Sequence, residues 1–138
     1  MTFTTLTHKR TFIVSIAPNE DIIESLKQFV KEQEITSGYL VGIGAVKSVR
    51  VAHYRVSDKK YTERTIKKPL EVTNITGIIT KDKAHVHITA GNQLFRGYGG
   101  HLVKAIVAAA CEIIVVATEE EIGRKHDEAV GLELLSLE

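Results

Sequence analysis

Residues 84–118 read AHVHITAGNQLFRGYGGHLVKAIVAAACEIIVVAT, and this stretch does most to decide the fold. The segment AHVHITA alternates with a period of two, which predicts a β-strand that ends at a turn over residues 91–93. Residues 101–107 and 112–118 are apolar and predict two further strands. A short helix over residues 101–111 is the alternative, because alanine-rich runs favour helix.

Strand patterns continue on both sides of this stretch. Branched, aromatic or alternating residues predict strands over residues 10–16, 39–46, 49–56, 70–80 and 130–137. The second and third of these form a predicted hairpin, and residues 70–80 form a strand pair or one strand bent around Gly77. The polar segments 57–68 and 119–128 are predicted loops.

One amphipathic helix is predicted after the first strand. Asn19 can cap it, and Glu20 and Asp21 then place negative charge in its first turn. The helix should end near Glu34, with Gly38 as its stop. Its apolar positions follow helical spacing: Ile22, Ile23, Leu26, Phe29 and Val30.

One helix and about seven strands joined by short turns predict an α+β fold, in which an antiparallel sheet packs on the main amphipathic helix. The length of 138 residues fits a single domain spanning residues 1–138. Apolar residues make up 43% and charged residues 25%, which is typical of soluble globular proteins.

Charge and targeting signals exclude several classes of protein. The net charge is +1, whereas nucleic-acid binding requires a concentrated basic stripe. The richest basic segment, residues 59–68, is predicted to be a solvated loop or hairpin. No signal core or membrane span is recognisable, so we expect a cytoplasmic protein. The lone cysteine, Cys111, lies in an apolar run and is predicted to be a buried structural thiol.

The spacing of three histidines carries the main chemical hypothesis. His85 and His87 lie two residues apart on a predicted strand and therefore project to the same side. His101 can join them if the chain folds back, and Gly99 and Gly100 would let the backbone bend or approach closely. Three imidazoles with an open fourth position are typical of a catalytic-type zinc site. The alternative is that they only form hydrogen bonds within a sheet or subunit interface.

Glu112 and three further histidines complete the set of candidate residues. Glu112 is either a buried acid that orients one of the histidines or an exposed glutamate on a sheet face. The remaining histidines, His8, His53 and His126, have no partner at ligand spacing and are expected at the surface.

The run HVH…GGHLVKAIVAAACEIIVV resembles the signature of the plants-and-prokaryotes-conserved (PPC) family. The likeness extends to SGYLVGIGAV, PLEVTNITGII and DEAVGLELL, and so covers essentially the whole chain. Ala84 stands where family members often have proline, and Ala110 where they commonly have threonine. These departures lie beside the three histidines and leave them in place.

The resemblance implies an α+β fold assembled as a homotrimer, with the apolar strands and the glycines Gly42, Gly44, Gly99 and Gly100 suited to intersubunit packing. It also implies a stand-alone prokaryotic type of unsettled role. Some such members bind a divalent metal through histidines that match His85, His87 and His101. Plant members carry AT-hook motifs and bind DNA, but no AT-hook occurs here, so nucleic-acid binding is not expected to carry over.

Three functions follow from these observations. The first is a trimeric metal-binding domain, with zinc as the expected metal and a small molecule at its open position. The second is a metal-dependent enzyme, which ranks lower because no general base is evident in the sequence. The third, a DNA-associated regulator, rests on analogy with the plant proteins alone.

Overall fold

Two strands much longer than predicted organise the structure, a computed structural model that describes residues 1–137. Strand β2 (Ser37–Arg55) has 19 residues and β6 (Gly97–Thr118) has 22. The hairpin predicted over residues 39–56 is wrong, because residues 39–55 belong to one strand whose irregular register bends it without a turn. The alternative helix over residues 101–111 is wrong, because this segment pairs with β2 and tertiary pairing overrides alanine's preference for helix.

The remaining elements are shorter. They are β1 (His8–Ile16), α1 (Ile22–Glu32), β3 (Lys60–Ile66), β4 (Leu70–Thr80), β5 (Ala84–Gly91), β7 (Gly123–Asp127) and β8 (Leu132–Ser136). Strand β3 lies in the basic segment predicted as a loop or hairpin, and it forms a hairpin with β2, whereas β7 lies in a segment predicted as a loop. Their side chains are mostly polar, so hydrophobic patterning gave no signal for them. The last predicted boundary, residue 138, lies outside the described residues.

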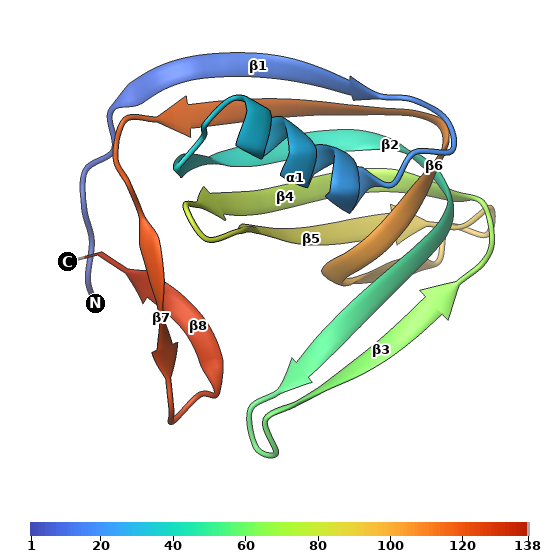
Figure 1. The fold of residues 1–138 in the computed structure, drawn as a ribbon. Helices are drawn as coiled ribbons and strands as arrows, with labels where there is room; N and C mark the ends of the chain where they lie inside the picture. Colours follow the sequence, from blue (N-terminus) through green and yellow to red (C-terminus); the bar gives the residue numbers. More distant parts are fainter. Residues whose placement is uncertain (138) are drawn as a thin grey trace.

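The main sheet contains six strands in the order β1-β6-β5-β4-β2-β3, and β6 also pairs with β2. All these pairings are antiparallel. The extra pairing closes β2, β4, β5 and β6 on one another, while β2 and β3 extend as a long hairpin (Figure 1). The predicted α+β class with an antiparallel sheet and one helix is therefore confirmed.

The N-cap of helix α1 lies two residues later than predicted. Asp21 is the N-cap, and its side chain accepts hydrogen bonds from the backbone N–H groups of Ile23 and Glu24. Asn19 instead adopts a positive φ of 74° in the preceding turn. The chain leaves the helix through Glu34, which has a φ of 52°, so Gly38 is not the stop and lies within β2.

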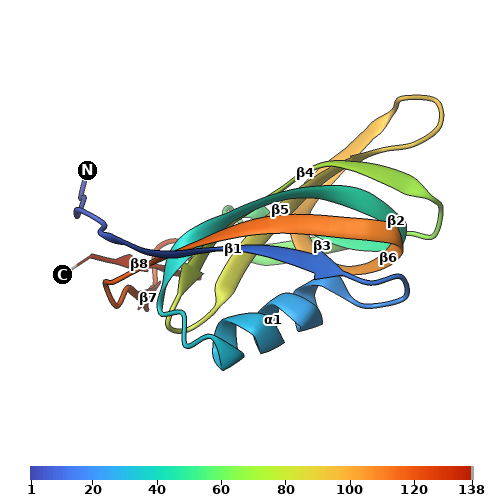
Figure 2. The same cartoon turned by 90° about the horizontal axis from the view of Figure 1, so that it is seen from above.

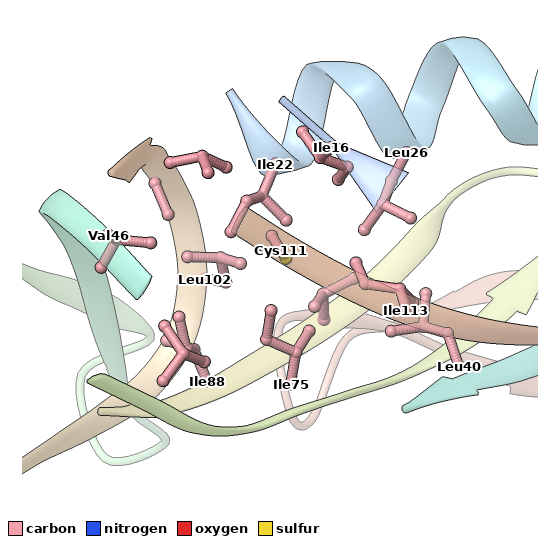
Figure 3. Packing of buried hydrophobic residues seen from close by; sticks show 14 of the residues in the cluster. Ile16, Ile22, Leu26, Leu40, Val46, Ile75, Ile88, Leu102, Cys111 and Ile113 are labelled. Atoms are coloured by element: carbon pink, nitrogen blue, oxygen red, sulfur yellow. The ribbon is translucent and has the colours of Figure 1, made fainter. Parts of the chain in front are cut away.

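The core lies between α1 and one face of the sheet (Figure 2). Ile22 and Leu26 from the helix point toward Cys111 and Ile113 of β6 (Figure 3). Cys111 is fully buried, and burial together with the Glu112 charge raises its pKa to about 11. The prediction of a buried structural thiol is therefore confirmed.

The opposite face of the sheet, here called the uncovered face, is apolar as well. Paired residues on adjacent strands project to the same side. The register links them into one row across the sheet, in the order Ile13, Ile114, Val41, Thr76, His87 and His101. A parallel row contains Val116, Tyr39, Ile78 and His85. Both rows therefore lead from exposed apolar side chains to histidines.

No helix within residues 1–137 has the length and apolar character that a membrane crossing requires.

Candidate metal centre

Strands β5 and β6 bring the three predicted histidines together. His87 pairs directly with His101 across the two strands, and His85 lies two residues before His87 on the same side of β5. The close backbone approaches expected at the two glycines are confirmed. A Cβ added at Gly100 would lie 2.8 Å from the carbonyl oxygen of Ala52, and one at Gly99 would lie 3.1 Å from that of Ile88. These glycines let β6 run between β5 and β2, which places His101 between the two strands.

The imidazole rings are close enough to share one ion. Nε2 of His87 lies 3.2 Å from Nε2 of His85. The ring centroids are 5.0 Å apart for His85 and His87, 5.0 Å for His85 and His101, and 5.6 Å for His87 and His101. One nitrogen from each ring can be chosen so that all three lie within 4.8 Å of one another. Zn–N bonds of about 2.0–2.1 Å place two tetrahedral ligands of one ion about 3.4 Å apart, so the set fits a zinc-sized ion once side-chain rotation brings the nitrogens closer together.

The environment keeps two of the rings neutral. Partial burial, reinforced by the neighbouring His101 and His87, lowers the pKa of His85 to about 4. Burial is also the largest cause of the lowered pKa of His101, followed by His87. A neutral imidazole is the form that ligates a metal. At neutral pH these two rings are therefore ready to bind without first losing a proton.

One atom of the cluster lacks a hydrogen-bond partner among the residues that the structure describes. Nδ1 of His101 is buried, and no residue from 1 to 137 forms a hydrogen bond with it. A buried polar atom without a partner costs about 1–3 kcal/mol, so such atoms commonly mark a missing ion or water. This orphaned nitrogen, together with the all-imidazole donor set, fits a divalent transition metal better than calcium or magnesium, which prefer oxygen.

The structure adds two neighbours that were not predicted. Glu63 of β3 pairs with Ala52, which itself pairs with His101, so the three lie in one row. The negative charge of Glu63 acts to raise the pKa of His101, opposing the larger effect of burial. Tyr61, two residues earlier, has its ring centroid 6.0 Å from that of His101. No local motif in KYTERTI marks these residues, because only the β2–β3 and β2–β6 registers bring them to the histidines.

Glu112 lies outside the histidine cluster. It pairs with Ser15 and Ile43, far along β6 from His101, and its side chain is exposed. Within one chain the structure therefore does not bring Glu112 to the histidines. The glycines Gly42 and Gly44 also differ from expectation, because their close approaches are to β6 of the same chain. They consequently give no support to intersubunit packing.

Comparisons with known proteins match both the fold and the sequence signature. The structure superposes with a TM-score of 0.90 on a metal-containing protein from Archaeoglobus fulgidus, at 28% identity and covering 99% of each chain. It superposes equally well, at 0.90 and 27% identity, on a PPC protein from Pyrococcus horikoshii, covering 99% of this chain and 97% of that one. A Bacteroides thetaiotaomicron protein named as a presumed DNA-binding protein gives 0.87 at 30% identity, covering 96% and 98%.

A sequence match leads to a longer protein. The bifunctional protein GlmU of Synechococcus sp. (strain JA-3-3Ab) is 25% identical over 131 residues, which are 94% of this chain and 21% of that protein. The chain thus spans about a fifth of the length of the curated relatives it matches. The model of the Plants and Prokaryotes Conserved (PCC) domain, the family also written PPC, matches residues 4–119. This chain belongs to the plants-and-prokaryotes-conserved domain family.

Proposed function

We propose that the chain is a cytoplasmic, homotrimeric PPC domain that binds a divalent metal ion, zinc, through His85, His87 and His101. The observation that carries this proposal is the convergence of three imidazole nitrogens within 4.8 Å, one ring of which has an orphaned buried nitrogen. The metal-containing relative from Archaeoglobus fulgidus supports it. With no acidic ligand in the cluster, three neutral donors would leave the charge of the ion uncompensated, which favours an anionic or polar small molecule at the open position.

The trimer is supported by the uncovered face. Its exposed large side chains are Ile13, Tyr39, Val41, Ile43, Ile78 and Ile114, and Ile13 is 80% exposed. A contiguous apolar patch of this kind commonly marks a contact between proteins. A second copy of this chain is the occupant that the family resemblance implies. The histidines stand at the end of the same rows, so a contact made there would lie beside the metal centre.

A metal-dependent enzyme is the second candidate, and Glu63 is the residue that favours it. A bound zinc ion would lower the pKa of its water ligand, and catalysis would also require a carboxylate to accept a proton. Glu63 is the acid that acts on the histidine centre, although it also pairs with Arg50 at 3.7 Å. A general role in DNA binding is less well supported, because the net charge is only +1.

Metal analysis of untagged protein tests whether the three histidines bind zinc. The parent should contain about one zinc ion per chain near neutral pH, and His87→Ala should lose it while remaining folded, because the core does not depend on the metal. His126→Ala is the matched control, since His126 lies on β7 outside the cluster, and it should retain the metal. A parent that neither copurifies with metal nor takes it up from solution would show that the cluster is only structural.

Light scattering tests the trimer independently. At micromolar concentration the particle should have the mass of three chains of 15.3 kDa each. A mass of one chain across the accessible concentration range would exclude the trimer and leave the metal proposal standing.

A further inference from the structure

A basic groove lies where β2, β6 and the segment after β3 meet. It is open to solvent, has a volume of about 510 Å³ and is lined by Lys47, Ser48, Val49, Arg50, Thr65, Lys67 and Lys104. Four of these seven residues are cationic, whereas the whole chain carries a net charge of only +1. The fold thus brings together positive charges that are far apart in the sequence, and none of the groove-lining residues within residues 1–137 is acidic.

The register makes this arrangement a property of the sheet. Arg50 pairs with Thr65 on one side and with Lys104 on the other, so these three residues form one row across β3, β2 and β6. Lys67 follows the end of β3 and lies just beyond Thr65. Side chains on a rigid sheet lose less freedom on binding than those on a mobile loop, so the groove is better organised for a ligand than a basic loop would be.

The nearby acids neutralise this charge only in part. Nζ of Lys104 lies 3.7 Å from a carboxylate oxygen of Asp21, and Nε of Arg50 lies 3.7 Å from one of Glu63. Both separations exceed hydrogen-bonding distance, and the cationic side chains are about half exposed. Lys47 donates to the neutral side-chain oxygen of Asn19. Within residues 1–137, Lys67 forms no ion pair. Donors in the groove therefore remain available for an anion.

We infer that this groove binds the phosphate groups of a small phosphorylated molecule. Arginine can hold phosphate oxygens with two parallel hydrogen bonds, lysines add point charges, and the hydroxyls of Ser48 and Thr65 supply neutral donors. A volume near 510 Å³ lies within the range of small-molecule sites. Duplex nucleic acid would instead require a longer basic stripe that follows its backbone.

Titration calorimetry with inorganic pyrophosphate tests the inference, on protein first stripped of metal with a chelator so that phosphate cannot ligate an ion at the histidines. We expect a dissociation constant below about 1 mM at low salt. The double variant Arg50→Gln/Lys104→Gln should bind at least about tenfold more weakly, because each charge-assisted contact is strong. The matched control Lys60→Gln/Lys125→Gln removes the same charge away from the groove and should bind like the parent.

Further probes distinguish the possible sources of phosphate. A nucleoside diphosphate should bind at least as well as pyrophosphate, and both should bind more tightly than a random DNA duplex per site. Tighter binding to the duplex would overturn the small-molecule assignment. Absent binding of pyrophosphate, or equal weakening by the control variant, would show that the groove is only a solvated basic surface. None of these outcomes depends on whether the histidines bind metal.

Discussion

Ile113 and Ile114 are adjacent in β6 and point to opposite faces of the sheet. Ile113 is fully buried beneath α1, whereas Ile114 is 45% exposed on the uncovered face. An antiparallel sheet with one face in water normally alternates apolar and polar residues. Here both faces carry isoleucine, valine or tyrosine. The packing of α1 within one chain explains the apolar residues of the buried face only. The apolar residues of the uncovered face require another explanation, such as contact with a second protein chain.

The largest effect should follow from truncating a buried side chain on the face of the sheet that α1 covers. Ile113→Ala removes side-chain atoms from a site with no exposed surface and should lower the free energy of unfolding by about 2–5 kcal/mol. Denaturant unfolding monitored by circular dichroism measures this loss. A loss below about 1 kcal/mol would mean that the core collapses around the site or that α1 packs less tightly than described.

Ile114→Lys tests the other face at the neighbouring position. A charge in the apolar patch should disrupt association and reduce the mass seen by light scattering to that of one chain, while the circular dichroism of the fold persists. Lys125→Gln, a charge change on β7, is the control and should keep the mass of the parent. Lys104→Gln would not serve as a control, because Lys104 lies in the basic groove. If Ile114→Lys keeps the mass of the parent, the uncovered face is not the interface between copies.

The lowered pKa of His85 should make the stability of the metal-free protein sensitive to acid. Because the pKa of His85 falls to about 4, below the ordinary value of about 6.5, the unfolded chain binds this proton more readily than the folded chain. The resulting stability is fully present above about pH 6.5 and is lost as the pH falls toward about 4. His85→Gln should flatten this part of the profile, which urea unfolding across the range will measure. An equally steep profile in the variant would assign the sensitivity to other groups.

The smallest expected difference is in zinc affinity, between substitutions of two glutamates. Glu63→Gln removes the carboxylate that acts on His101 and should weaken zinc binding by about tenfold, the lower end of the roughly 10–100-fold loss that removal of an outer partner commonly causes. Glu112→Gln should leave the affinity within about twofold, because in one chain Glu112 lies beside Ser15 and Ile43. Competition with a fluorescent zinc chelator compares the two. A larger effect of Glu112→Gln would indicate that another copy brings this residue to the histidines.

Regular patterns in the sequence were sufficient to predict much of the fold and the histidine cluster. The alternation in AHVHITA predicted β5, and the two-residue spacing placed His85 and His87 together. Glu63 and the groove residues could not be predicted, because they meet through pairing between distant strands and no local period marks them. The continuous course of β6 was missed for a related reason, since alanine residues 108–110 lie between segments held by pairing, up to Val107 with β2 and from Cys111 with β1 and β2.

The length of β6 has a consequence for how this protein can change over time. Its side chains alternate strictly from Cys111 to Val115, so one inserted residue before Cys111 would exchange the two faces. Ile114 would turn inward beneath α1 and Ile113 outward, while His101, on the other side of the insertion, would keep its place. An insertion of two residues would preserve the alternation and shift only the register with β1 and β2. Sequence drift in this strand should therefore tolerate substitutions far more readily than insertions or deletions of odd length.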